Sequence, residues 1–352
     1  MRNASHISGL LALFVLCALA AIPMACDTGG TSPPEPKPLP GQWEPLGLEG
    51  EPVGDIKAIA VHPENPDVLY AAGWGGLFKT ADGGETWDTL RTEDIYSDVQ
   101  ISSPAPEVVY AVDQGIPSTI IKSTDSGETW EKVADGFNTS STSWTSIALD
   151  PRTPDVLYAV ATGTHGGCPF KTADGGESWK ALSGPTGLCD SGTGIAVNPA
   201  SPEVIYVGKG GELLESPDGG ATWASVRSGL VGFIHFAPAS GALYASMLPG
   251  LHRSTDGGET WKVEVVADSV TGLFQMAFRP QAGERYLATR EGVYLSRADS
   301  AWVEVSTGLP HRWVNEIAVG AAGNRLYAGL KRVSGRAHGL YVRELTDTQS
   351  GQ

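Results

Sequence analysis

The stretch Thr80-Ala-Asp82-Gly-Gly84-Glu-Thr86-Trp87 decides the fold, because the chain repeats it along most of its length. Further copies begin at Ser123, Thr172, Ser216 and Ser254. Each copy keeps aspartate at the third position, glycine at the fifth and tryptophan at the eighth. A sixth copy, Ser296-Arg-Ala-Asp299-Ser-Ala-Trp302, has lost the glycines. Repetition of this kind indicates a repeat architecture, in which one supersecondary unit recurs and stacks on its neighbours.

Two apolar stretches precede each copy and complete a unit of four short strands. In the first unit they are Ala58-Ile-Ala-Val61 and Val68-Leu-Tyr-Ala71, separated by a turn that contains His-Pro. The first stretch recurs at residues 99–101, 146–149, 194–197, 233–236, 275–278 and 316–319. Short strands at even spacing, with turn residues between them, are typical of propeller blades. We therefore predict an all-β protein, a single seven-bladed β-propeller of four-stranded blades.

The seventh unit lacks its outer strand, and the N-terminal part of the domain supplies a candidate for it. The unit ends after residues 339–343, without a motif or a tryptophan strand. The stretch Gln42-Trp43-Glu-Pro-Leu46 matches the outer strand Thr86-Trp87-Asp-Thr-Leu90. We predict that residues 42–346 form the propeller and that the N-terminal strand closes the ring, which hides sheet edges that would otherwise invite association.

The repeated motif resembles the Asp-box, or bacterial neuraminidase repeat, over nearly all of residues 42–343. The aspartate can accept backbone N–H bonds across a turn, glycine tolerates positive φ there, and tryptophan can pack beneath the turn. Five outward-facing copies argue against catalytic acids or calcium ligands, so we interpret them as structural and expect no metal and no cofactor. The structural residues are Asp82, Asp125, Asp174, Asp218, Asp256, Trp87, Trp130, Trp179, Trp223 and Trp261.

The N-terminal segment indicates export. Residues 1–25 combine Arg2 with a short apolar run, typical of a signal peptide. They lead into Ile22-Pro23-Met24-Ala25-Cys26, which resembles a lipobox, so we predict that Cys26 is lipidated and anchors the protein to the bacterial cell membrane or envelope. Cleavage within residues 18–21 and release as a soluble secreted or periplasmic protein is the alternative. Residues 26–41 are rich in Pro and Gly and predict a tether, and residues 347–352 a polar tail.

Charge and cysteine content restrict the partners and the redox state. The formal net charge is −16, and residues 1–25 contribute only the positive charge of Arg2. So acidic a protein is not expected to bind nucleic acid. We expect a monomer. Export permits a disulfide between Cys168 and Cys189, although two free thiols remain an alternative.

Basic residues cluster in consecutive loops of the last two units, on the face opposite the Asp boxes. Only Glu291 is close to them in the sequence, so we predict a local positive patch that attracts an anionic partner. The predicted contact residues are Arg290, His311, Arg312, Lys331, Arg332 and Arg336. We also assign Trp74, Trp144 and Trp313 to this face.

Two classes of function fit this arrangement. Exported single propellers resemble photosystem II assembly factors, which implies a non-catalytic binding or scaffolding lipoprotein that contacts an envelope protein. The alternative is a glycan-active protein, either a glycoside hydrolase, a sialidase-like enzyme or a lectin. It would stack sugars on Trp74, Trp144 and Trp313 and use paired carboxylates such as Asp98 and Glu316. The arginine triad and Tyr-Glu pair of sialidases are not recognisable here. Xyloglucan-cleaving hydrolases place their cleft between two propellers, and this chain predicts one.

Overall fold

The computed structural model describes residues 41–49, 53–92, 94–134, 142–163, 169–182, 192–209, 211–247, 250–297 and 299–346. The predicted signal peptide, the lipidation site Cys26, the disulfide between Cys168 and Cys189, most of the tether and the polar tail lie outside these residues. Within them, the one helical segment is η1 (Pro280–Ala282), and no helix is long and apolar enough to cross a bilayer.

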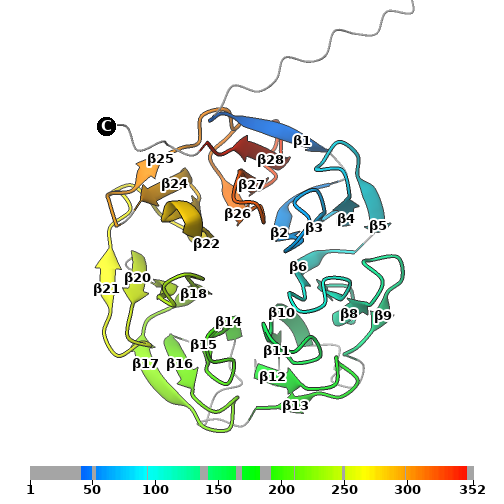
Figure 1. The fold of residues 1–352 in the computed structure, drawn as a ribbon, viewed down its shortest axis with the longest axis vertical. Helices are drawn as coiled ribbons and strands as arrows, with labels where there is room; N and C mark the ends of the chain where they lie inside the picture. Colours follow the sequence, from blue (N-terminus) through cyan, green and yellow to red (C-terminus); the bar gives the residue numbers. More distant parts are fainter. Residues whose placement is uncertain are drawn as a thin grey trace, which may run out of the picture. The chain divides into compact units, whose positions relative to one another are not determined.

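Seven antiparallel sheets of four strands each are arranged in a ring (Figure 1). Blades one to three are β2 (Ile56–Val61), β3 (Leu69–Gly73), β4 (Gly76–Thr80) and β5 (Asp88–Arg91); β6 (Tyr96–Ile101), β7 (Val109–Asp113), β8 (Thr119–Ser123) and β9 (Glu131–Lys132); and β10 (Thr142–Leu149), β11 (Leu157–Gly163), β12 (Pro169–Thr172) and β13 (Lys180–Ala181). Blades four to six are β14 (Gly192–Val197), β15 (Ile205–Lys209), β16 (Glu212–Ser216) and β17 (Ala224–Ser228); β18 (Val231–Phe236), β19 (Leu243–Met247), β20 (Gly250–Ser254) and β21 (Lys262–Glu264); and β22 (Leu273–Arg279), β23 (Glu284–Thr289), β24 (Gly292–Arg297) and β25 (Val303–Glu304). The predicted seven-bladed propeller is confirmed.

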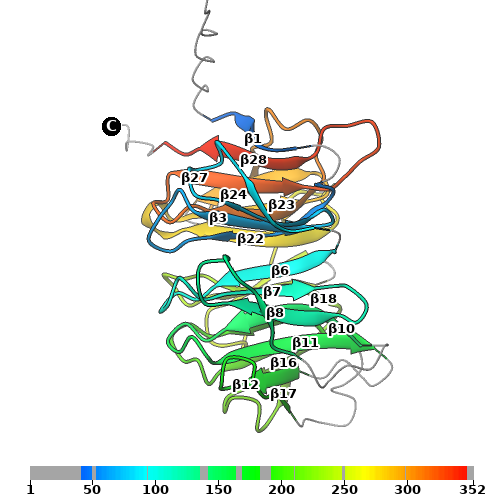
Figure 2. The ribbon, with the colours of Figure 1, turned by 90° about the vertical axis from the view of Figure 1, so that its right-hand side faces the viewer.

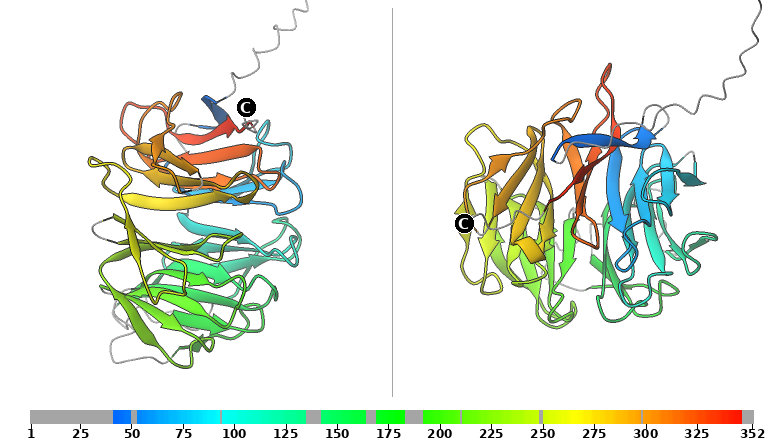
Figure 3. Two further views of the ribbon diagram at one scale, coloured as in Figure 1. Left: turned by 60° about the vertical axis from the view of Figure 1, so that its left-hand side comes forward. Right: turned by 45° about the horizontal axis from the view of Figure 1, so that its top comes forward.

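Blade seven joins the two ends of the described chain. It comprises β26 (Val314–Val319), β27 (Arg325–Leu330), β28 (Gly339–Glu344) and, as its outer strand, β1 (Trp43–Glu49). Trp43 pairs with Arg343, and the Trp43 indole N–H donates to the Val305 carbonyl of blade six at 2.7 Å. Figure 3 shows the blue strand β1 beside the red strand β28. The N-terminal strand therefore closes the ring, as predicted.

Each Asp box is a hydrogen-bonded turn between the third and fourth strands. In the first, the Thr80 hydroxyl donates to Asp82 Oδ1 at 2.7 Å and accepts the Gly84 N–H at 2.9 Å. Asp82 also accepts the N–H of Thr86 at 2.9 Å and its hydroxyl at 2.5 Å. The equivalent bonds, led by those from the following Thr or Ser hydroxyl, hold the pKa values of Asp125, Asp174 and Asp256 at about 2. These carboxylates are occupied in the turn.

A buried tyrosine on the second strand of each blade packs against the next blade. All seven are at most 1% exposed: Tyr70, Tyr110, Tyr158, Tyr206, Tyr244, Tyr286 and Tyr327. The Tyr70 hydroxyl donates to the Ser126 carbonyl at 2.6 Å, and the Tyr206 hydroxyl to the Gly257 carbonyl at 2.7 Å. Both carbonyls belong to the Asp-box turn of the next blade. Apolar side chains pack between the same sheets, as where Tyr70, Val99 and Val109 join blades one and two.

Every innermost strand carries a β-bulge at the same height. The register shifts between Ile56 and Ala58 in β2, and equivalent shifts occur in β6, β10, β14, β18, β22 and β26. A bulge increases the local twist and redirects the side chains that follow it. The residues at and after these bulges supply most of the polar wall of the central channel.

Removing one inter-blade hydroxyl should weaken the ring measurably. We expect Tyr206→Phe to lower the free energy of unfolding by about 1 kcal/mol, because the Gly257 carbonyl loses its donor. The matched control is Tyr327→Phe, since the buried Tyr327 hydroxyl donates to no turn carbonyl among the described residues. Its unfolding free energy should stay within about 0.5 kcal/mol of the wild type in urea titrations. Equal losses in both variants would contradict a stabilising role for the hydrogen bond between Tyr206 and the Gly257 carbonyl.

Candidate functional site

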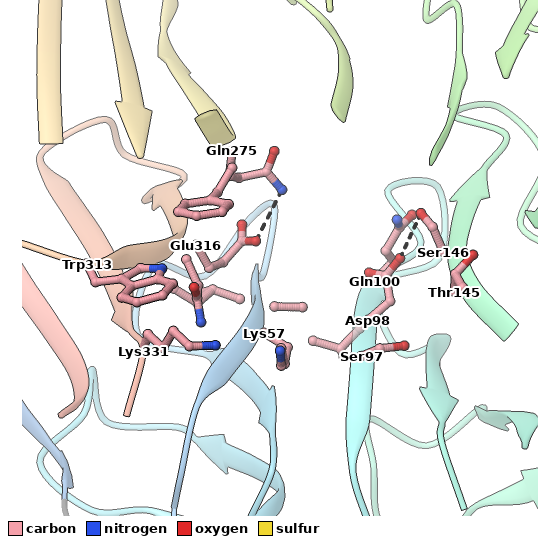
Figure 4. A pocket seen from close by; sticks show the side chains of 15 residues that line it. Lys57, Ser97, Asp98, Gln100, Thr145, Ser146, Gln275, Trp313, Glu316 and Lys331 are labelled. Carbon is pink, nitrogen blue, oxygen red and sulfur yellow. Dashed lines mark hydrogen bonds between the residues drawn. The ribbon is translucent and has the colours of Figure 1, made fainter. Parts of the chain in front are cut away.

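A cavity of about 500 Å³ opens from the channel between the inner strands of blades one, two, three, six and seven (Figure 4). Its wall is mostly polar, in contrast to the apolar layers between the blades. Its lining includes Lys57, Ala58, Asp98, Val99, Gln100, Ser146, Phe274, Gln275, Trp313, Asn315, Glu316 and Lys331. No group of three or more His, Cys, Asp or Glu suited to a metal occurs in the part of the chain that the structure describes.

Two carboxylates face this cavity from blades on either side of blade one. Asp98 Oδ2 accepts the Ile147 N–H at 3.0 Å and the Ser146 hydroxyl at 3.3 Å, which ties blade two to blade three. Burial raises the pKa of Asp98 to about 6, against the opposing effect of these hydrogen bonds. Burial also raises the pKa of Glu316 well above its usual value, and the negative charge of Asp98 adds to that shift. This pair was predicted from the sequence, and the structure brings both residues to one cavity.

A side-chain relay extends from Glu316 through three blades. Gln275 Nε2 donates to Glu316 Oε2 at 3.2 Å, and Gln275 Oε1 bonds to His235 Nε2. Since the amide oxygen can only accept, His235 carries its proton on Nε2. Burial lowers the pKa of His235 to about 4, so the imidazole is neutral at pH 7. Neither Gln275 nor His235 was predicted, because a single Gln and a single His on inner strands give no motif.

Two lysines form a positive edge of the cavity. The Lys331 amino group lies 3.3 Å from Asp55 Oδ2, and the Lys57 amino group lies 3.8 Å from the same oxygen. Burial is the largest influence on Lys57 and lowers its pKa; Asp55 opposes this effect and Lys331 adds to it. Two lysines thus share a single carboxylate, which leaves an excess positive charge.

The structure brings three of the predicted contact residues together around one indole ring. The Arg290 guanidinium lies 4.5 Å from the centroid of the Trp313 ring, and the Lys331 amino group lies 4.9 Å from it. Phe274 stacks beside Trp313, with centroids 6.5 Å apart and planes 11° apart. Arg332 and Arg336 are exposed on the loop between β27 and β28, which Figure 2 shows projecting from the ring in orange-red.

Two other predicted contact residues need correction. His311 is only 5% exposed, and its Nδ1 accepts the backbone N–H of Trp313. It therefore stabilises the loop that leads into β26 and does not form part of the contact surface. Arg312 is exposed but forms an ion pair with Glu304. Glu291 is therefore not the only acid near the patch. Glu304 lies eight residues before Arg312, whereas Asp55 is distant in sequence and reaches the patch only through the fold.

The predicted tryptophan platforms also separate. Trp144 is 2% exposed and packs against Phe170 and Trp179, with ring centroids 5.2 and 5.6 Å apart, so it belongs to the core between blades. Trp74 is 54% exposed but does not line the cavity. Trp313 lines the cavity, yet Arg290, Lys331 and Phe274 already contact its ring. The three rings do not form a sugar-stacking platform.

The raised pKa of Asp98 predicts a pH-dependent contribution to stability. The folded protein binds more protons than the unfolded chain between about pH 4 and about pH 6, so this contribution is complete below the unfolded pKa and is lost as the pH rises through the folded value. We expect Asp98→Asn, which keeps an acceptor for Ile147, to gain stability relative to the wild type as the pH rises from 4 to 7. Urea unfolding at several pH values measures this, and a constant difference would contradict it.

Comparison with known proteins supports the repeat and the fold. The BNR/Asp-box repeat family model matches residues 252–263, around the fifth full copy. No curated protein matches the sequence.

Three solved structures are similar to this chain. YCF48 bound to D1 peptide is 19% identical, with 87% of this chain and 97% of that chain covered and a TM-score of 0.63. YCF48 from Cyanidioschyzon merolae is 20% identical, with 88% and 100% covered and a TM-score of 0.62. The GH74 xyloglucanase from Xanthomonas campestris is 18% identical, with a TM-score of 0.66; 89% of this chain is covered but only 55% of that enzyme. The repeat, the hydrogen-bonded turns and these neighbours identify a seven-bladed β-propeller built from BNR/Asp-box repeats.

Proposed function

We propose that this protein is a non-catalytic binding or scaffolding protein of the cell envelope, whose channel-mouth face holds an acidic segment of a partner protein. The observation that carries the proposal is the cluster of Arg290, Trp313 and Lys331 beside the exposed Arg336. The proposal follows from charge placement, because these cations gather on one rim of a protein whose formal net charge is −16.

The availability of the arginines supports this surface. Arg290 and Arg336 are exposed, and no acidic side chain among the described residues lies within ion-pair distance of either. The contact with the Trp313 ring holds the Arg290 guanidinium in place. A guanidinium held in this way loses less side-chain entropy when it binds a carboxylate in a bidentate manner.

The position of the loops supports the same face. In an antiparallel blade, successive loops alternate between the two faces of the ring. Loops between the second and third strands therefore lie on the face opposite the Asp-box turns. Arg290 and residues 331–338 occupy such loops in adjacent blades, and Figure 3 shows the second loop projecting beyond the ring. The similar YCF48 structure contains a D1 peptide, which makes protein binding a reasonable use of this fold.

A capture experiment tests the contact surface. We expect the domain from Gln42 onward to retain a partner from detergent-solubilised native membranes, and the variant Arg290→Glu, Arg332→Glu, Arg336→Glu to lose it. The matched control, Lys132→Glu, Lys180→Glu, Lys262→Glu, makes the same charge change on exposed outer strands and should retain the partner. Circular dichroism and thermal unfolding confirm that both variants are folded. Equal capture by both variants, or no capture by the wild type, would contradict the proposal.

Membrane attachment through Cys26 is the second part of the proposal. It rests on the apolar N-terminal run and on the lipobox-like residues 22–26. In cells fed an alkyne fatty acid, the full-length protein should become labelled and fractionate with membranes. The variant Cys26→Ser should be unlabelled and should not remain with the washed membranes. A labelled Cys26→Ser protein would contradict lipidation at this residue, and an unlabelled wild type would instead favour release as a soluble protein.

A further inference from the structure

We propose that the channel cavity binds a small zwitterion that carries both an ammonium and a carboxylate group, of the class of an α-amino acid with an apolar side chain. The inference concerns the interior of the channel and does not depend on protein capture at the rim. It rests on the separation of unbalanced charges within one cavity of about 500 Å³, a size typical of small-molecule sites.

One part of the cavity wall, formed by blades two and seven, carries hydrogen-bond acceptors that the described residues satisfy only in part. The amide group of Gln100 donates to the Ile147 carbonyl at 2.6 Å, and that of Asn315 to the Ile56 carbonyl at 3.3 Å. Their amide oxygens make no hydrogen bond to the described residues. Asp98 and Glu316 have no cation within ion-pair distance in the same part of the chain. An ammonium group, with three N–H donors and a positive charge, complements this wall.

The opposite charge belongs to Lys57 of blade one and Lys331 of blade seven, on the same side of the cavity as Glu316. Figure 4 shows the amino groups of Lys57 and Lys331 on one side of the cavity and Asp98 across from them. Because the two lysines share Asp55, one positive charge remains for a carboxylate. The same lysines disfavour a bare metal cation.

The space between the two acids is lined by small and apolar groups. Ala58 of blade one occupies the position that Asp98 and Glu316 occupy in the adjacent blades, immediately after the bulge. Its single methyl group leaves room between the carboxylates. Val99 and Phe274 line the same cavity, so an apolar side chain can be accommodated. A neutral sugar fits less well, because the ring of Trp313 is already contacted by Arg290, Lys331 and Phe274.

Binding of an ammonium group should displace a proton from the cavity. The buried Glu316 carboxyl has a raised pKa in the free protein, and an adjacent positive charge would lower it again. A neutral sugar has no charge with which to shift this equilibrium. Proton release therefore distinguishes the two classes of ligand.

Isothermal titration calorimetry on the domain from Gln42 onward tests the inference, after a thermal-shift screen of the standard α-amino acids. L-phenylalanine and L-leucine are the first probes. We expect saturable binding, with phenylalaninamide and 3-phenylpropionate each at least about tenfold weaker because each lacks one charge. The binding enthalpy should change with the ionisation enthalpy of the buffer, which reports proton release.

Matched variants separate the cavity from the fold. Glu316→Gln and Lys331→Met should each weaken binding about tenfold, and Glu316→Gln should also abolish the buffer dependence. Glu131→Gln and Lys132→Met, on the exposed strand β9, should leave binding unchanged. Failure of every amino acid to bind, equal binding of phenylalaninamide and L-phenylalanine, or tighter binding of glucose or a xyloglucan oligosaccharide would overturn the inference.

Discussion

The packing of a buried tyrosine against the next blade, which Tyr70 and Tyr206 reinforce with a hydrogen bond to the Asp-box turn there, is the contact on which the ring depends. The hydrogen bond requires a turn whose carbonyl points at the neighbouring blade, and the Asp-box hydrogen bonds hold the turn in that shape. Close packing sets the same constraint. A Cβ on Gly84, which has φ +99°, would lie 2.4 Å from Leu46 Cγ of the preceding blade. Glycine is needed there because the Asp-box turn is in close contact with the preceding blade.

Blade six shows how the contact is maintained when the box is lost. Asp299 adopts φ +64° without the neighbouring glycines and accepts a hydrogen bond from Arg253 at 2.6 Å. Arg285 replaces the missing turn: its Nη1 donates to the Tyr244 hydroxyl and to Glu264, both at 2.9 Å. A charged network thus closes the seam between blades five and six. The contacts that close the ring lie at the Asp-box turns, between the sheets and along the outer strands. The inner strands are therefore free to carry polar residues into the channel.

The repeats predicted the fold almost completely, since spacing and turn chemistry are local properties. Strand number and the structural role of the Asp boxes follow from residues close together in the sequence. Ring closure joins Trp43 to Arg343 and was predicted because residues 42–46 match the outer strand at residues 86–90. The candidate site was harder to predict from the sequence. Burial of Trp144 depends on the bulge in β10, and the pairing of Arg312 with Glu304 depends on the path of the loop between β25 and β26. The pairing of Lys331 with Asp55 depends on a contact between distant segments. Asp98 and Glu316 were recognised as a pair, but their shared cavity depends on Ala58 between them.

The two faces of the ring differ: the Asp-box turns hold the blades together, and we propose that the opposite rim meets the partner. Photocrosslinking in intact cells tests this division directly. With p-benzoylphenylalanine at the exposed position of Ser334, in the loop between β27 and β28, ultraviolet light should produce a specific higher-mass adduct. The same probe at the exposed position of Glu177, in an Asp-box turn, should produce none. Adducts from Glu177 and none from Ser334 would place the contact on the wrong face and contradict the account.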